Sequence, residues 1–316
     1  MRTRCIADVL EDENRRFLIA GCGGGYDIVG GIPLAAMIDI PHRTHFASLS
    51  FSNLAELGCR RPDPALKHLF RITDAQATTS AYCPEAWLAH WYQAHPLAER
   101  GCDCEAVIWG FDKTGVRPLR AAYQFLVDSL KIDTIIVVDG GVDSLLRGDE
   151  SVLGTPEEDF ATLAAVHGVR GPTKILACIG LGAEVRDGIC HEQVFARMHE
   201  LTTHGGYLGG QPLVAGTYPA WAYVQALDFV ATNQTGQRGS HVHRVIRAAL
   251  TGSHIDTNVW LSPLSSMFWC FDLDRVAETN RILPALEDTE TIQEVTTRIE
   301  GVRKSLHIRD RTVIPL

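Results

Sequence analysis

The feature of the sequence that most restricts its fold is a series of short, mostly apolar runs that end at glycine or an acidic residue. Residues 134–138 read Thr-Ile-Ile-Val-Val. A β-branched run of this kind is typical of a strand buried on both faces, as inside a parallel sheet. Comparable runs occupy residues 16–21, 106–111 and 174–180, with helical patterns between them. We therefore expect an α/β fold whose central sheet is mainly parallel and contains these four strands.

The length and composition suit one large globular unit. The chain has 316 residues, of which 46% are hydrophobic and 21% charged. That is enough to bury the core of a large α/β domain, and no repeat or linker divides it. We expect a single domain over residues 1–316, with a glycine-rich ligand-binding half (about residues 1–150) and a C-terminal half of helices and strands (about residues 151–316).

The charge pattern limits the partners. The formal net charge is −9 and no cluster of Lys or Arg interrupts it, which argues against nucleic acid as a partner. A small anionic molecule stays open as a ligand, because a few arginines or a helix start can hold one. The aromatic side chains expected on a helix at 84–95 suit either the core or a subunit contact, so a homo-oligomer also stays open.

The cysteines and apolar runs bear on the compartment. No apolar run reaches the length that spans a membrane, and the first ten residues do not resemble a signal peptide. Most of the nine cysteines are isolated, and the one close pair, Cys102 and Cys104, has no second pair with which to form a zinc site. We expect reduced thiols and a cytoplasmic protein without a membrane partner.

The segment 139–150 is the strongest candidate for a site. It follows the apolar run directly and carries four carboxylates beside Arg147. Ligands of open α/β sheets bind at the carboxyl ends of strands. We expect Asp139 and Asp143 to act as catalytic groups or to bind a divalent cation, Mg²⁺ or Ca²⁺, because carboxylate oxygens suit these ions. Arg147 would pair with a phosphate or hold the acids in place. The alternative is an acidic surface loop.

A glycine-rich turn forms the second candidate. Residues 21–27 read Gly-Cys-Gly-Gly-Gly-Tyr-Asp and lie between the first strand and a helix expected over 27–37. Free N–H groups at a helix start can receive a phosphate or carboxylate. A dinucleotide site would require glycine where Tyr26 stands and an acid at the end of the second strand, which instead continues into Ser52 and Asn53. We therefore expect a general nucleotide or phosphate site. Asp27 either caps its helix or faces the same site as Asp139.

Later segments add further candidates. Asp159 lies one turn into a helix that begins near Pro156, where Thr155 and Glu158 predict a capping box. Four glycines surround Tyr207, which predicts a loop that contacts the ligand. The candidate ligand-binding residues are Gly21, Gly23, Gly24, Gly25, Asp27, Asn53, Gly140, Gly141, Glu150, Asp159, Gly182 and Tyr207.

Four segments together carry a resemblance to a known family. Residues 21–27, 138–150, 153–159 and 205–210 occur in the order found in the domain-of-unknown-function family numbered 1152, which this chain resembles over nearly its whole length. The resemblance implies a Rossmann-like, three-layer α/β fold. The family usually has glycine at the position of Tyr26. The resemblance implies no reaction.

Three functions remain open from the sequence. The first is a hydrolase or transferase that acts on a nucleotide, nucleoside or phosphorylated sugar. The second is an NAD(P)-dependent oxidoreductase, which Tyr26 and the absent acid disfavour. The third is a non-catalytic nucleotide-binding sensor. Among the histidines we consider only His204 and His241 as acid–base candidates, since His241 and His243 would face different sides of their helix.

Overall fold

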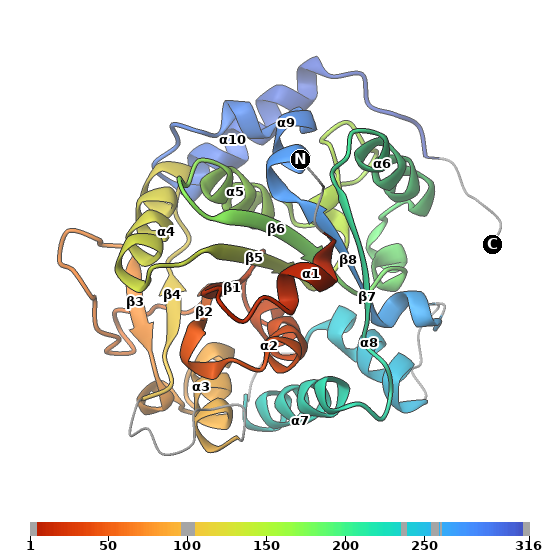
Figure 1. The fold of residues 1–316 in the computed structure, drawn as a ribbon. Coiled ribbons are helices and arrows are strands. Elements are labelled where there is room, and N and C mark those ends of the chain that lie inside the picture. Colours follow the sequence, from red (N-terminus) through yellow and green to blue (C-terminus); the bar gives the residue numbers. More distant parts are fainter. Residues whose placement is uncertain (1–4, 96–104, 235–238, 254–258, 260, 312–316) are drawn as a thin grey trace.

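The strands of the protein form one continuous sheet (Figure 1). The structure is a computed structural model that describes residues 5–95, 105–234, 239–253, 259 and 261–311. Within these ranges the sheet has eight strands in the order β3-β4-β2-β1-β5-β6-β8-β7. The strands are β1 (Phe17–Gly21), β2 (Thr44–Leu49), β3 (Leu69–Ile72), β4 (Ile108–Phe111), β5 (Thr134–Asp139), β6 (Thr173–Cys178), β7 (Tyr207–Pro212) and β8 (Met267–Asp272).

The centre of the sheet is parallel. Strands β4, β2, β1, β5 and β6 pair in parallel, whereas β3 at one edge and β8 and β7 at the other pair antiparallel. The four strands expected from the apolar runs are β1, β4, β5 and β6, and all four lie in this parallel part. The predicted α/β fold with a mainly parallel sheet is therefore confirmed.

Helices cover both faces of the sheet, which gives three layers (Figure 1). Alternate residues of β5 enter different cores: Ile135 and Val137 pack on one face, and Ile136 and Val138 on the other. The first face carries α4 (Val116–Leu130), α5 (Pro156–His167), α6 (His191–Thr203), α9 (Leu273–Thr279) and α10 (Ile292–Ser305), and the second carries α1 (Ile6–Leu10), α2 (Ile32–Ile38), α3 (Pro84–Ala94), α7 (Tyr218–Asn233) and α8 (His241–Thr251).

Three local predictions are wrong in detail. The helix expected over 27–37 begins as a 3-10 turn, η1 (Asp27–Gly31), and becomes α-helical only at Ile32. The loop expected around Tyr207 is the edge strand β7, because its backbone pairs with β8. Thr155 precedes α5, but its side chain makes no capping bond; its hydroxyl donates to Asp143 instead.

The described helices and cysteines bear on the environment of the protein. None of these helices is both long and apolar enough to cross a membrane. None of its seven described cysteines forms a disulfide, and six of them are buried. Cys102 and Cys104 lie outside the described residues.

Candidate functional site

Five acidic side chains lie where the carboxyl ends of three neighbouring strands meet. Because β1, β5 and β6 are adjacent and parallel, the segments that follow them leave the sheet at the same edge. The acidic cluster consists of Asp27 after β1, Asp139 and Asp143 after β5, Asp159 in the first turn of α5, and Glu184 in the 3-10 turn η5 (Ala183–Asp187) after β6. All of these except the part-buried Asp27 are at most 8% exposed. The structure thus brings together Asp27, Asp139, Asp143 and Asp159, as the sequence predicts, and adds Glu184.

Backbone N–H and side-chain hydroxyl groups donate hydrogen bonds to three of the carboxyl groups. Asp139 accepts hydrogen bonds from the backbone N–H and the hydroxyl of Ser144. Asp143 accepts from the N–H of Thr155, 2.9 Å away, and from its hydroxyl. Glu184 accepts from the N–H of Val142 at 2.6 Å. Loops from three parts of the chain are thereby tied to one another through acidic groups, which orients the carboxylates without neutralising them.

The glycines predicted to bind a ligand border the cluster at close range. The N–H of Gly23 donates to Asp27 at 2.7 Å, and a Cβ on Gly23 would lie 2.5 Å from an oxygen of Asp159. A Cβ on Gly141 would lie 2.8 Å from the Glu184 carboxyl group. A side chain at either position would therefore displace the facing carboxyl group. Gly23, Asp27 and Gly140 are only part-buried, so the cluster reaches solvent on this side.

The acids of the cluster are poorly matched by positive charge. Burial raises the pKa of Asp139, Asp159 and Glu184 well above their usual ranges, and the charge of Asp143 raises it further in each case. Burial likewise raises the pKa of Asp27 to about 7, although the hydrogen bond from Gly23 lowers it. No Lys or Arg of the described chain is among the groups that shift the pKa of these acids most. At neutral pH the cluster therefore holds protons that ordinary carboxyl groups would have lost.

Asp143 differs from its neighbours. Burial raises its pKa, but the N–H of Thr155 and a hydrogen bond with Glu184 oppose the shift. The same hydrogen bond raises the pKa of Glu184. Within this pair the hydrogen bond favours the ionised form of Asp143 and the protonated form of Glu184.

The cluster does not form a ready-made metal cage. Within the described ranges, no group of three or more His, Cys, Asp or Glu side chains is placed to hold a metal ion. Mg²⁺ usually keeps several waters and uses one or two carboxylates together with oxygens of the substrate. Asp139 and Asp143 fit that second arrangement, in which the ligand completes the shell of the ion.

One functional candidate that the sequence analysis missed is His243 on α8. Its side chain is fully buried, and burial lowers its pKa to about 4, so the imidazole is neutral. Its Nδ1 is 2.8 Å from the hydroxyl of Tyr223 on α7. The spacing His243, Ile246, Leu250 along α8 places the histidine on the apolar stripe, which could have indicated burial. His241, which the sequence analysis preferred, bonds the carbonyl of Ala183.

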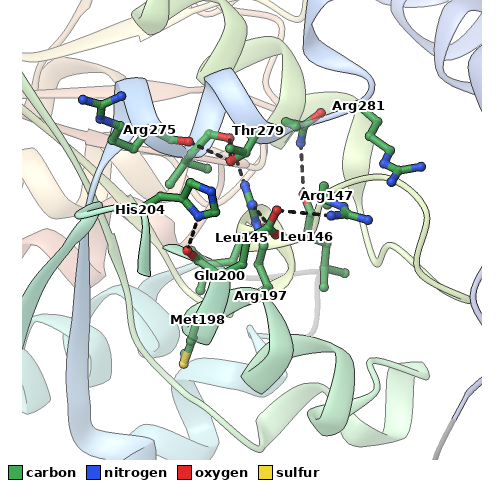
Figure 2. Close-up of polar contacts among 12 residues, drawn as sticks. Leu145, Leu146, Arg147, Arg197, Met198, Glu200, His204, Arg275, Thr279 and Arg281 are labelled. Atoms are coloured by element: carbon green, nitrogen blue, oxygen red, sulfur yellow. Dashed lines mark hydrogen bonds and ion pairs between the residues drawn. The ribbon is translucent and has the colours of Figure 1, made fainter. Parts of the chain in front are cut away.

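Arg147 lies in a different network from the one expected. It pairs with Asp149 at 2.7 Å and with Glu200 of α6 at 3.2 Å, and Figure 2 shows Arg147 and Arg197 both directed at Glu200. Glu150 accepts from the N–H groups of Arg147 and Gly148 and from the Arg309 side chain. No contact joins either residue to the acidic cluster in the described chain. Arg147 and Glu150 therefore stabilise the loop and leave the acids uncompensated.

Asp149 is a buried acid outside the cluster, and its charge is compensated by arginines. Burial opposes ionisation of Asp149, but its hydrogen bond from Arg147 and the charges of Arg309 and Arg281 lower its pKa. Asp149, a buried acid that stabilises the fold, is thus paired with three arginines. Among the described residues, no arginine or lysine pairs with the acidic cluster, which is typical of groups arranged for a ligand or for chemistry.

The other predicted ligand residues lie around or away from the cluster. Gly24 has φ +96° and its Cβ position is 2.6 Å from the carbonyl oxygen of Leu49, so glycine is required there by the close approach of β2. Asn53 is exposed and accepts from the N–H of Glu56, which fits a turn. Gly182, with φ +97°, begins the turn that carries Glu184. Tyr207 packs on Phe271 in the core, with ring centroids 5.4 Å apart, and no contact takes it to the cluster in the described residues.

Comparison with known proteins places the chain in a family. The family described as "Protein of unknown function (DUF1152)" matches residues 100–304. The chain belongs to this family. Neither a search of curated proteins nor a search of solved structures gave a match.

The DUF1152 match covers most of the acidic cluster. Asp139, Asp143, Asp159, Glu184 and His243 lie inside the matched residues, whereas the glycine turn and Asp27 precede them. The resemblance seen in the sequence is confirmed, and so is the Rossmann-like fold that it implied.

Proposed function

We propose that this DUF1152 protein is a hydrolase or transferase that acts on a nucleotide, nucleoside or phosphorylated sugar at the acidic cluster. The observation that carries the proposal is the convergence of five acidic side chains at the carboxyl ends of β1, β5 and β6, with no Lys or Arg of the described ranges paired to them. Ligands of open α/β sheets bind at this edge. Keeping these acids unpaired is costly for the fold, which supports a catalytic use.

A divalent cation fits between the cluster and the substrate. Hydrogen bonds from Thr155 and Glu184 favour the ionised form of Asp143, although burial raises its pKa. Asp139 has one oxygen, Oδ2, occupied by Ser144 and the other left for an ion. Mg²⁺ or Ca²⁺ bound by these two acids would neutralise the cluster and draw protons from it. When bound, the ion would polarise an oxygen of the substrate.

The glycine turn supports the cation rather than direct phosphate binding. Its Gly23 N–H already donates to Asp27, and the carboxylates of Asp27 and Asp159 border it. An anionic phosphate next to these groups would be repelled unless an ion lay between them. The anionic ligand is therefore expected to enter together with its cation, and Asp27, with a pKa of about 7, is suited to give or take a proton near neutral pH.

The test is metal-dependent stabilisation followed by metal-dependent turnover. Melting temperatures would be measured with MgCl₂ and CaCl₂, alone and with adenosine, adenosine 5′-monophosphate and D-ribose 5-phosphate, and products would be followed by chromatography. We expect stabilisation by a metal and sugar compound together, and its loss in Asp143→Asn. A protein indifferent to every combination would refute the proposal.

The two alternatives have distinct outcomes in the same experiment. Stabilisation by NAD(H) without metal would favour the oxidoreductase, which the exposed, turn-capping Asn53 after β2 disfavours. Binding without turnover would favour the sensor. The seven described cysteines form no disulfide, which supports a reducing compartment, so we propose the cytoplasm as the location of the protein.

A further inference from the structure

A buried hydrogen-bonding atom without a partner lies beside the acidic cluster. The Nε2 atom of His243 is inaccessible to solvent and has no hydrogen-bond partner among the described residues. Such an atom is costly inside a protein, because it has lost water and gained nothing in exchange. A ligand that forms a hydrogen bond with Nε2 would remove this free-energy cost.

The tautomer of His243 follows from its one partner. Its Nδ1 lies 2.8 Å from the hydroxyl of Tyr223, and this is the hydroxyl's single hydrogen bond in the described chain. If Nδ1 carried the proton, the buried Tyr223 O–H would have no acceptor. When Tyr223 donates to Nδ1 instead, both groups are satisfied and a neutral imidazole carries its proton on Nε2. The unpartnered atom is therefore a donor.

The donor faces an acceptor across Gly140. A Cβ on Gly140 would lie 2.8 Å from His243 Nε2 and also 2.8 Å from Asp27 Oδ1. A donor and a carboxylate acceptor thus flank the same face of one residue, and that residue has no side chain. Gly140 and Asp27 are part-buried, so this face adjoins the open side of the cluster.

We propose that His243 Nε2–H and Asp27 Oδ1 together bind one hydroxyl group of the sugar of the substrate. A hydroxyl group both accepts and donates, so it can accept from Nε2–H and donate to the Asp27 carboxylate. A fully ionised phosphate has no proton to donate and would be repelled by the Asp27 carboxylate, and an ammonium group has no lone pair with which to accept. The pair therefore selects a hydroxyl, and Tyr223 acts as a positioning residue that holds the tautomer. This inference rests on the proposed function and narrows its substrate to compounds with a free sugar hydroxyl.

The first test needs no ligand. Nitrogen-15 NMR of histidine-labelled protein at pH 8 reports which ring nitrogen carries the proton, and the signal of His243 is identified by its loss in His243→Phe. We expect the Nε2–H tautomer in the natural chain and a mixture of tautomers in Tyr223→Phe. A proton on Nδ1 in the natural chain would overturn the assignment of the donor, whatever the protein binds.

The second test measures binding of D-ribose 5-phosphate with MgCl₂ by calorimetry. We expect His243→Phe to weaken binding about tenfold, the value of one hydrogen bond, and Tyr223→Phe to weaken it about threefold. The matched control, Arg244→Lys, lies at an exposed position on the same helix and should change binding less than twofold. If His243→Phe fails to fold, Tyr223→Phe decides the matter.

The outcomes separate this inference from the proposed function. Equal binding by the natural chain, His243→Phe and Tyr223→Phe would overturn the hydroxyl contact and leave metal-dependent sugar binding intact. Failure of the natural chain to bind D-ribose 5-phosphate would overturn this inference, and failure to bind adenosine and adenosine 5′-monophosphate as well would also overturn the proposed function. Loss of binding in Arg244→Lys to the same degree would show a general effect on α8 and also overturn the contact.

Discussion

Replacing Asp27 by asparagine should change the stability of the protein in a way that depends on pH. Burial raises the pKa of Asp27 from 3.8 to about 7 in the folded protein. Below pH 4 the group is protonated in both states and contributes nothing. Between pH 4 and pH 7 the folded state keeps the proton that the unfolded state has lost, so the group lowers stability by about 1.4 kcal/mol per pH unit. Above pH 7 the loss is constant.

The magnitude follows from the shift. A difference of about three units corresponds to roughly 4 kcal/mol that Asp27→Asn would recover at pH 8. Asparagine has one acceptor oxygen, so it keeps the bond from Gly23 but not a second bond from the Gly140 N–H, at a cost of about 1 kcal/mol at every pH. We expect the variant to be about 1 kcal/mol less stable at pH 4 and about 3 kcal/mol more stable at pH 8. Removing the charge also lowers the pKa of Asp139 and Asp159, which acts in the same direction.

The assay is urea unfolding followed by tryptophan fluorescence, for which the chain has six tryptophans. Unfolding free energies would be measured at pH 4.5, 6 and 8 for the natural chain and the variant. Glu300→Gln, at an exposed position on α10, serves as a control and should stay within about 0.5 kcal/mol of the natural chain. A difference for Asp27→Asn that is the same at all three pH values would refute the reasoning.

Three further outcomes are expected. Asp139→Asn keeps an acceptor for Ser144 and removes the repulsion from Asp143 and Asp27, so the melting temperature of the variant should equal or exceed that of the natural chain. Its Mg²⁺-dependent turnover should fall at least about 100-fold. An unfolded variant would mean that Asp139 holds the loop after β5 together. Gly24→Val should destabilise by more than 2 kcal/mol in chemical unfolding, because φ is +96° and its Cβ would meet the Leu49 carbonyl; an unchanged midpoint would contradict this. Arg197→Leu should lower the free energy of unfolding by about 3 to 5 kcal/mol, because the buried guanidinium pairs with Glu200 (Figure 2) and donates to the carbonyls of Leu145 and Val276. A loss below about 1 kcal/mol would show that these groups find other partners.

The sequence by itself determined the class of fold and the position of two acids. A run such as Thr134–Val138 has no polar face, so it is stable only when both of its faces are covered, and that condition defines a central strand of an α/β sheet. Asp139 follows the run directly and therefore lies at the carboxyl end of the strand. Asp143 is four residues further along and stays close. These conclusions depend on local periodicity, which the chain shows without its tertiary structure.

Only the tertiary structure decided which acids share a site. Arg147 is closer in sequence to Asp143 than Asp159 is, yet it turns toward Glu200, and Asp159 joins the cluster. His243 and Asp27 come from opposite ends of the chain and meet across Gly140. Spacing cannot predict these contacts, because the order of strands in the sheet is set by how their faces pack and not by their order in the chain. Strand β1 lies between β2 and β5, and this neighbourhood alone brings the glycine turn to the acids of β5.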